Sequence, residues 1–425
     1  MSATNIILKI TNFFKPLLKK IVPIKLLRWV KESMMSRKTN AFIEQGIQPL
    51  DIQKYPKGMN LIGNIKAEIG LGQSCRLVAA QIEQSSLLYS VYNFRADGNI
   101  REQDNSFEEK IQSILPYSIN LFHINPYELD LACLELKKES WDFRYNIGFW
   151  LWELEDFPEK WTRFFPLLNE IWTPSQFITD SIKKKTDKPV KTVPYCVTAP
   201  IDEKYDRTYF NLPKDIFLFL TMYDAGSTME RKNPMGAIHA YKKAFGKEDK
   251  SVGLVIKINN SKKEDIAILK DSLKGYANIH FITETLEKVQ VNSLIKQMNT
   301  FVSLHRAEGF GLVLAEAMLV GVPTIATNWS SNTEFMNPEV ACMVDYEIVE
   351  IKKICGQYKV GQKWAEPSVD MAAEYMKKLY EDKKFCNQIS SKALSYITEK
   401  LSMENAVRLI EARIDEIYRE NGEKG

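Results

Sequence analysis

The sequence predicts an α/β protein with two doubly wound domains, and three observations lead to this prediction. The chain has 425 residues, which is too long for one compact core and suits two domains of ordinary size. Short apolar runs alternate with segments of helical periodicity, a pattern typical of βαβ units and parallel sheets. The alternation pauses at a Pro- and Asp-rich stretch, residues 198–214, and then resumes, which indicates an interdomain linker.

The expected strands are short runs rich in apolar, β-branched and aromatic residues. In the first half they are residues 60–65, 86–94, 117–125, 145–155, the start of 170–182, and 190–197. In the second half they are residues 216–224, 252–259, 279–283, 300–304 and 322–327, with helices expected at 233–245, 262–276 and through most of 367–425. We therefore expect an N-terminal extension at 1–55, Rossmann-like domains at 56–200 and 201–385, and C-terminal helices at 386–425 that pack back on the first domain.

The charge of the chain is unevenly distributed. Residues 1–38 contain nine Lys and Arg but one acid, Glu32, whereas the rest has 48 basic and 53 acidic residues. The basic character is therefore local, and a chain-wide nucleic-acid footprint is not expected.

The basic N-terminal segment has apolar residues at a spacing of three to four between its lysines, interrupted by Pro16 and Pro23. Two interpretations remain open: a helix attracted to an anionic membrane surface, or a helix packed on the protein itself. No run of about 18 apolar residues predicts a membrane span. The six cysteines form no CxxC pair, which favours a reducing compartment and argues against structural zinc.

The most informative stretch is HRAEGFGLVLAEAMLVGVPTIA, residues 305–326, which follows an expected strand. Gly309 and Gly311 allow the backbone to approach a ligand closely, and the following helix offers unpaired N–H groups to an anion. Glu308 lies in the turn, and Glu316 lies within the helix. In open parallel sheets, ligands bind beyond the carboxyl ends of the strands, which is where this turn falls.

This stretch resembles the retaining glycosyltransferases of the GT-B fold, specifically their family 4. The resemblance rests on Glu308 and Glu316 with seven residues between them, on Phe310-Gly311, and on the run Gly321-Val322-Pro323-Thr324-Ile325-Ala326. It extends over much of 216–336. It implies a fold of two Rossmann-like domains facing a central cleft, here with a basic helical N-terminal extension.

The resemblance also implies roles for individual residues. Glu308 would contact hydroxyls of the transferred sugar, and Glu316 would contact the ribose hydroxyls of the nucleotide. Carboxylates suit both tasks because each can accept two hydrogen bonds from a diol. The backbone of Gly309, Phe310, Gly311 and Leu312 would hold the sugar and phosphate.

A basic element, Glu230-Arg231-Lys232-Asn233-Pro234, lies just past the strand at 216–224. Lys232 matches the family's phosphate-binding lysine, and positive charge would stabilise the departing diphosphate. Many family members have an arginine about six residues earlier, where this chain has Gly226, so Arg231 is expected to serve instead. Lys257, a charge within the apolar strand at 252–259, is a second candidate for the donor site.

In the first half, Gly70-Leu71-Gly72 follows a strand and opens a helix. The third glycine of a dinucleotide-binding fingerprint is replaced by Cys75, so a nicotinamide site is rejected. In the GT-B fold the equivalent turn faces the donor phosphates, a role that suits Gly70 and Gly72.

His123 ends another expected strand, and family members often have a histidine near the anomeric carbon at a comparable place. A hydrogen-bonded core histidine is an equally open interpretation. The aromatic run 149–161 contains Trp150, Trp152 and Trp161. Core packing is expected for these rings, with acceptor binding by Trp152 or Glu153 as the alternative.

The sequence thus predicts a retaining glycosyltransferase that moves a sugar from a nucleotide-diphosphate sugar to a glycan or lipid-linked glycan, with bacterial surface polysaccharide or O-antigen synthesis suggested by family analogy alone. No cofactor or metal is expected beyond this co-substrate. A cytoplasmic location is expected, with the inner membrane face as a possible site of attachment. Competing hypotheses are a GT-B epimerase or phosphorylase and a catalytically silent carbohydrate-binding or scaffold subunit.

Overall fold

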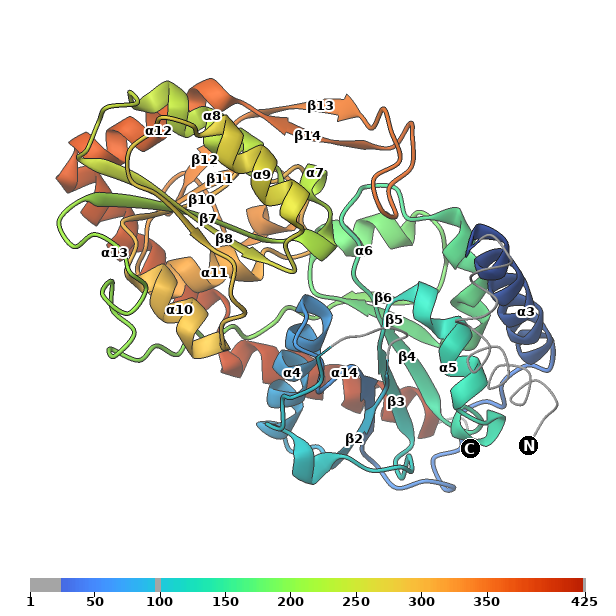
Figure 1. The fold of residues 1–425 in the computed structure, drawn as a ribbon. Helices are drawn as coiled ribbons and strands as arrows, with labels where there is room; N and C mark the ends of the chain where they lie inside the picture. The colour runs from blue at the N-terminus through green and yellow to red at the C-terminus, as the bar shows by residue number, and fades with distance from the viewer. Residues whose placement is uncertain (1–23, 96–100, 423–425) are drawn as a thin grey trace.

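The computed structural model describes residues 24–95 and 101–422, and it contains two parallel six-stranded sheets (Figure 1). The N-terminal sheet has the order β2-β1-β3-β4-β5-β6. Its strands are β1 (Met59–Gly63), β2 (Tyr89–Asn93), β3 (Ile119–His123), β4 (Tyr145–Phe149), β5 (Glu170–Thr173) and β6 (Val190–Thr192). The C-terminal sheet has the order β12-β11-β10-β7-β8-β9. Its strands are β7 (Phe217–Asp224), β8 (Val252–Asn259), β9 (Ile279–Ile282), β10 (Thr300–Ser303), β11 (Thr324–Thr327) and β12 (Cys342–Val344).

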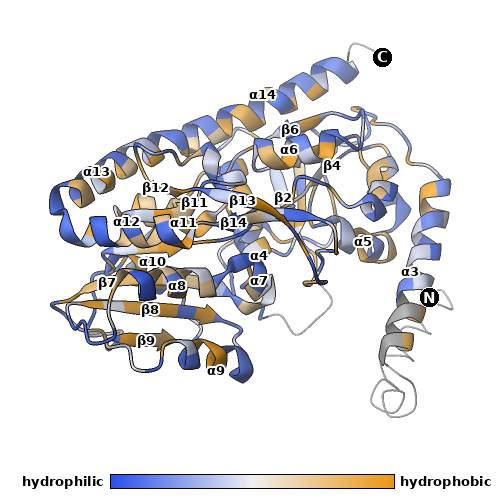
Figure 2. Cartoon of the chain, turned by 90° about the horizontal axis from the view of Figure 1, so that it is seen from above, coloured by the Kyte–Doolittle hydropathy of each residue, from blue (hydrophilic) through white to orange (hydrophobic). Residues whose placement is uncertain are grey.

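Helices cover the two faces of each sheet, so most strands are buried on both sides. The N-terminal domain has α4 (Gly70–Glu83), α5 (Leu129–Glu135) and α6 (Gln176–Lys183). The C-terminal domain has α7 (Met229–Lys232), α8 (Pro234–Ala244), α9 (Lys263–Ser272), α10 (Lys288–Lys296), α11 (Leu312–Leu319), α12 (Val369–Glu381) and α13 (Lys383–Lys400). Figure 2 shows the expected consequence, because β7, β8 and β9 are mostly hydrophobic whereas α13 and α14 carry many hydrophilic residues.

The last helix, α14 (Met403–Gly422), leaves the C-terminal domain and packs against α4 of the N-terminal domain. Its Arg413 reaches Glu170 at the start of β5, with Nε 3.1 and 3.0 Å from the two carboxylate oxygens. Glu170 is fully buried and also accepts hydrogen bonds from Tyr145 Oη and Trp172 Nε1, at 3.0 and 2.6 Å. A buried ion pair therefore ties the end of the chain to the first sheet.

The N-terminal extension contributes one described helix, α3 (Ile24–Glu44). It packs on α5 and on the 3₁₀ segment η4 (Glu159–Leu167), where Arg163 Nη1 donates to Ser36 Oγ at 2.7 Å. The helix extends past the basic segment of residues 1–38 and ends at Glu44. The expected amphipathic pattern before Pro23 lies outside the described residues.

A two-stranded antiparallel hairpin, β13 (Tyr346–Glu350) and β14 (Lys363–Pro367), was not predicted from the sequence. It extends from the C-terminal domain toward the N-terminal domain (Figure 1). Two aromatic residues of this segment, Tyr358 and Trp364, join the hydrophobic cluster that includes Trp152 of the N-terminal domain. The hairpin therefore bridges the two domains.

Candidate functional site

The turn after β10 carries the acidic motif that the sequence singled out. Gly311 caps α11 with φ of 93°, a left-handed conformation that favours glycine. A Cβ at this position would lie 3.3 Å from Asn332 Cβ, so the turn is also tightly packed. The backbone N–H of Glu308 donates to Ser330 Oγ at 2.9 Å, which fixes the carboxylate at the end of the sheet.

The basic element lies beside this turn, as predicted from the position of both at strand ends. Arg231 and Lys232 are on the short helix α7, which ends at Asn233 in a left-handed conformation (φ of 50°). Asn233 Nδ2 donates to the carbonyl oxygen of Leu304 at 2.8 Å, and Arg231 Nη1 donates to that of Ala307 at 2.8 Å. These bonds join the loop after β7 to the loop after β10.

The carboxylate of Glu308 is paired with both cations of α7. Lys232 Nζ donates to its Oε1, and Arg231 Nη1 lies 3.5 Å from its Oε2. Burial alone would raise the pKa of Glu308, but the charges of Lys232, Arg231 and His305 outweigh it and lower that pKa to about 2. Burial lowers the pKa of Lys232, and Glu308 opposes this effect. At neutral pH the site therefore contains an ionised carboxylate between Lys232 and Arg231.

Glu316 is buried on α11, with 1% of the residue exposed. Its Oε1 is paired with Lys288 Nζ at the start of α10, whereas its buried Oε2 has no hydrogen-bond partner among the described residues. Lys288 was not predicted, because nothing in its local sequence signals a partner 28 residues away. One oxygen of Glu316 is thus a buried acceptor without a partner among the described residues.

Lys257 lies on β8, in register with Met222 of β7, and is fully buried. Its Nζ donates to Asn259 Oδ1. Burial lowers the pKa of Lys257 to about 8, although the carboxylates of Glu284 and Asp224 oppose this shift. Lys257 lies next to β7, the strand that precedes Arg231 and Lys232. It forms no hydrogen bond or ion pair with Glu308.

His123 ends β3 and is fully buried. Its Nε2 lies 2.8 Å from Ser74 Oγ, which is also bonded to Tyr195 Oη, and its ring stacks on Phe149 at 4.7 Å. Burial lowers the pKa of His123 to about 4, so the imidazole is neutral at physiological pH. The ring of Tyr195 contacts Phe310 of the acidic motif at 4.8 Å. Ser74 and Tyr195 therefore connect His123 to the turn that carries Glu308, a connection that the sequence did not reveal.

The two N-terminal glycines lie in the first turn of α4, which begins at Gly70. A Cβ on Gly72 would lie 2.0 Å from the carbonyl oxygen of Ala67, whereas a Cβ on Gly70 would meet no atom within 4 Å. Gly72 thus has a clear packing reason in the loop after β1, and Gly70 leaves open space at the helix start.

The tryptophans of the aromatic run are core residues, so the alternative of acceptor binding by Trp152 is wrong for this structure. Trp150 and Trp152 are fully buried and Trp161 is 3% exposed. Trp152 packs edge-on against Trp161, and its Nε1 donates to the carbonyl oxygen of Asp156 at 2.9 Å. The run leaves the sheet at Phe149, where β4 ends, and turns toward the C-terminal domain with Glu153 partly exposed.

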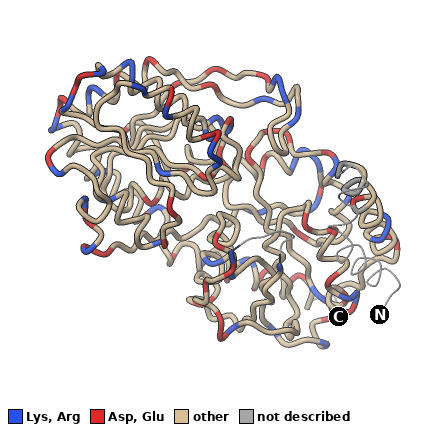
Figure 3. The backbone as a smooth tube through the Cα atoms, viewed as in Figure 1, with Lys and Arg blue, Asp and Glu red and all other residues tan. Residues whose placement is uncertain are grey.

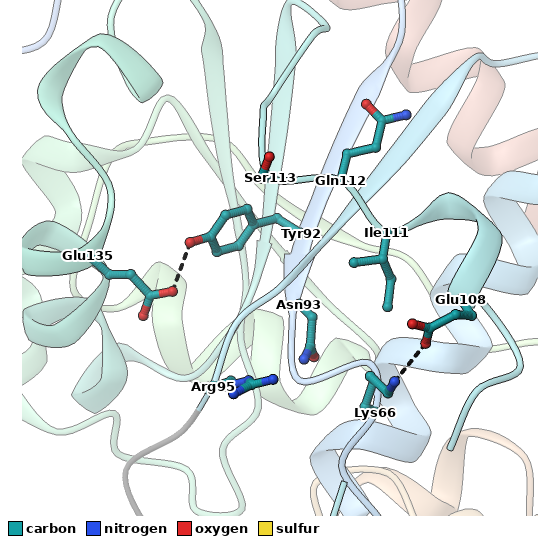
Figure 4. Close-up of a pocket in the computed structure, with 9 residues that line it drawn as sticks. All are labelled: Lys66, Tyr92, Asn93, Arg95, Glu108, Ile111, Gln112, Ser113 and Glu135. Atoms are coloured by element: carbon teal, nitrogen blue, oxygen red, sulfur yellow. Dashed lines mark hydrogen bonds and ion pairs between the residues drawn. The ribbon is translucent and has the colours of Figure 1, made fainter. Parts of the chain in front are cut away.

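A separate pocket of about 400 Å³ lies at the edge of the N-terminal sheet (Figure 4). It is lined mainly by polar side chains, including Tyr92 and Asn93 at the end of β2. Two hydrogen bonds join side chains of its lining. Tyr92 Oη donates to Glu135 Oε1 at 2.8 Å, and Lys66 Nζ donates to Glu108 Oε2 at 2.6 Å. None of its lining residues was among the predicted site residues.

Charged residues of both signs are interspersed over the described chain (Figure 3). Within residues 24–95 and 101–422, no group of three or more His, Cys, Asp or Glu side chains has a geometry that could hold a metal ion. No helix in the same part of the chain is long and apolar enough to cross a membrane.

Comparison with known proteins gives one family match. Residues 220–395 match the family model described as Glycosyl transferases group 1. No curated protein matches the sequence.

Solved structures share the fold at low sequence identity. Anabaena HepE in complex with UDP-glucose has a TM-score of 0.62 and 12% identity, covering 85% of this chain and 100% of that one. Sucrose-phosphate synthase from Thermosynechococcus elongatus has a TM-score of 0.60 and 13% identity, covering 89% of this chain and 100% of that one. A glycosyltransferase from Rickettsia africae has a TM-score of 0.57 and 11% identity, with coverage of 85% and 99%. The predicted GT-B fold of two parallel α/β domains is therefore confirmed, and residues 220–395, in the C-terminal domain, match the glycosyl transferases group 1 model.

Proposed function

We propose that this protein, a glycosyltransferase by its group 1 domain, is a retaining enzyme of family 4. It transfers a sugar from a nucleotide-diphosphate sugar to a hydroxyl of a glycan or lipid-linked glycan. The observation that carries the proposal is the buried carboxylate of Glu308 between Lys232 and Arg231, at the start of α11. An elongated ligand with a polyol at one end and a diphosphate beside it would satisfy all three side chains.

The donor would be held by groups that the structure leaves available. Glu316 Oε2, which has no partner among the described residues, would accept a hydrogen bond from a ribose hydroxyl, and Lys288 on the other oxygen orients that carboxylate. Lys232, Arg231 and the N–H groups at the start of α11 would bind the diphosphate. Glu308 would then accept hydrogen bonds from hydroxyls of the transferred sugar.

In the proposed reaction, the bond between the anomeric carbon and the diphosphate oxygen breaks while the acceptor oxygen bonds to the same face of the sugar. The diphosphate departs with the electron pair, stabilised by the two cations, and takes the proton of the acceptor hydroxyl. The α configuration is kept, and neither a metal nor a covalent sugar–enzyme intermediate is required. His123, neutral and fully buried, would support the sugar side of this site through Ser74 and Tyr195.

A donor panel tests the proposal directly. UDP-, GDP- and dTDP-sugars are added to the full chain, starting with UDP-glucose because HepE binds it. At 100 times its dissociation constant, the true donor should stabilise the fold by about 2.7 kcal/mol in thermal unfolding. It should also release its nucleoside diphosphate, and NMR of the product should show an α linkage. Binding without turnover would favour the silent-subunit hypothesis, and no binding by any sugar nucleotide would contradict both.

The acceptor is proposed to be part of bacterial surface polysaccharide or O-antigen synthesis at the inner face of the membrane. This proposal is supported by the nine basic residues among residues 1–38. Because α3 packs on α5, the informative truncation removes residues 1–23 and keeps the described helix. We expect the truncated chain to lose binding to liposomes that contain phosphatidylglycerol, measured by flotation at low salt. Equal flotation of both chains would rule out membrane attachment through residues 1–23.

A further inference from the structure

We propose that Glu153, on the loop after β4, binds the attacking hydroxyl of the carbohydrate acceptor. The inference rests on the proposed function and adds an acceptor subsite to it. Glu153 follows the buried Trp152, and its carboxylate faces Arg231 and Tyr358 of the C-terminal domain. It therefore belongs to the first domain but lies at the site of the second.

The position of Glu153 is defined by two contacts with the C-terminal domain. Its Oε1 lies 3.9 Å from Arg231 Nη2, and the Nη1 of the same guanidinium lies 3.5 Å from Glu308 Oε2. A Cβ on Gly309 would lie 3.6 Å from Glu153 Cγ, so the side chain lies beside the turn that carries Glu308. One carboxylate from each domain thus lies against a single arginine.

The hairpin holds the other oxygen of this carboxylate. Tyr358 Oη donates to Glu153 Oε2 at 3.0 Å, and Gln357 Nε2 donates to it at 3.4 Å. Tyr358 is itself buried at 2% exposure, with its ring 5.7 Å from that of Trp152. Oε1 accepts no hydrogen bond among the described residues, and 18% of the Glu153 side chain is exposed. The carboxylate is therefore fixed through one oxygen and open at the other.

The negative charge of Glu153 argues against a role in binding the diphosphate of the donor. A carboxylate beside Arg231 reduces the positive potential that a diphosphate needs, so it weakens donor binding. A neutral acceptor hydroxyl has the opposite requirement, because it donates a hydrogen bond and an ionised carboxylate accepts it strongly. In the transfer step Glu153 orients the acceptor oxygen toward the anomeric carbon, and the hydroxyl proton passes to the departing diphosphate. The proton therefore does not pass to Glu153.

The test compares Glu153→Gln with Glu155→Gln, an exposed carboxylate on the same loop. Release of nucleoside diphosphate is measured with the donor from the panel, with water alone and with a mixture of p-nitrophenyl glycosides. Affinity for UDP is measured by calorimetry. We expect Glu153→Gln to lower turnover at least tenfold while UDP binds as tightly as in the wild type or more tightly. Glu155→Gln should match the wild type in both measurements.

Tyr358→Phe separates acceptor binding from domain packing, because it removes only the hydroxyl that holds Glu153. We expect a smaller loss of turnover and unchanged UDP affinity. Turnover of Glu153→Gln within threefold of the wild type would overturn the proposal, and so would weaker UDP binding. A wild-type chain that turns over no sugar nucleotide would instead contradict the proposed function. In that case the UDP affinity of Glu153→Gln, compared with that of the wild type, would still test whether Glu153 lies outside the donor site.

Discussion

Glu308→Gln should lower kcat/KM for sugar transfer about a hundredfold, which corresponds to about 2.7 kcal/mol. Glutamine keeps the shape of the side chain but cannot neutralise Lys232 and Arg231, which both lie against the carboxylate. It also accepts weaker hydrogen bonds from sugar hydroxyls than an ionised carboxylate does. The loss is therefore expected in turnover of the intact sugar nucleotide.

Binding of the nucleoside diphosphate alone should respond in the opposite sense. With the carboxylate gone, the two cations are released to the diphosphate, so UDP or its counterpart should bind at least as tightly as before. The matched control is Glu339→Gln, an exposed carboxylate of the same domain, which should leave transfer unchanged. Transfer by Glu308→Gln within threefold of the wild type would remove Glu308 from the donor site.

Arg413→Met should destabilise the fold by about 3–5 kcal/mol, because it leaves the carboxylate of Glu170 buried without its cation. Glu170 is fully buried, and the hydrogen bonds from Tyr145 and Trp172 do not supply a positive charge. The free energy of unfolding is measured with urea at pH 7. Arg419→Met changes an exposed arginine of the same helix and should have little effect.

A double variant makes the Arg413 test specific to the ion pair. Adding Glu170→Gln to Arg413→Met removes the uncompensated charge, so part of the lost stability should return. A loss below about 1 kcal/mol in the single variant, or no recovery in the double variant, would show that the pair is not a major support of the fold.

The parts of the molecule that could be predicted from sequence depend on local patterns. Buried parallel strands such as VGLVIKIN of β8 are apolar almost throughout, so their existence follows from composition. Glu308 and Lys232 are 76 residues apart, yet both follow strands of one parallel sheet, and the carboxyl ends of such strands lie at one edge. Their proximity therefore follows from topology without knowledge of side-chain packing.

The parts that could not be predicted depend on packing between distant segments. The strand β13 has no buried residue. It therefore has no buried face that would require the regular alternation of apolar and polar residues by which a half-buried strand is recognised. Lys288 and Tyr358 become site residues only because α10 and the hairpin are packed against α11 and the loop of Glu153. Neither residue carries a local signal, and the same holds for Ser74, whose role depends on the positions of His123 and Tyr195.

The path of α14 has a mechanical consequence. The chain enters the C-terminal domain through the segment between β6 and β7 and returns to the N-terminal domain between α13 and α14. Two covalent crossings restrict relative motion mainly to rotation about the line that joins them, and sliding or twisting would strain one crossing or the other. Rotation that opens the site would then separate Glu153 from Arg231. On closing, the loops that bind donor and acceptor would return to the same relative position in each catalytic cycle.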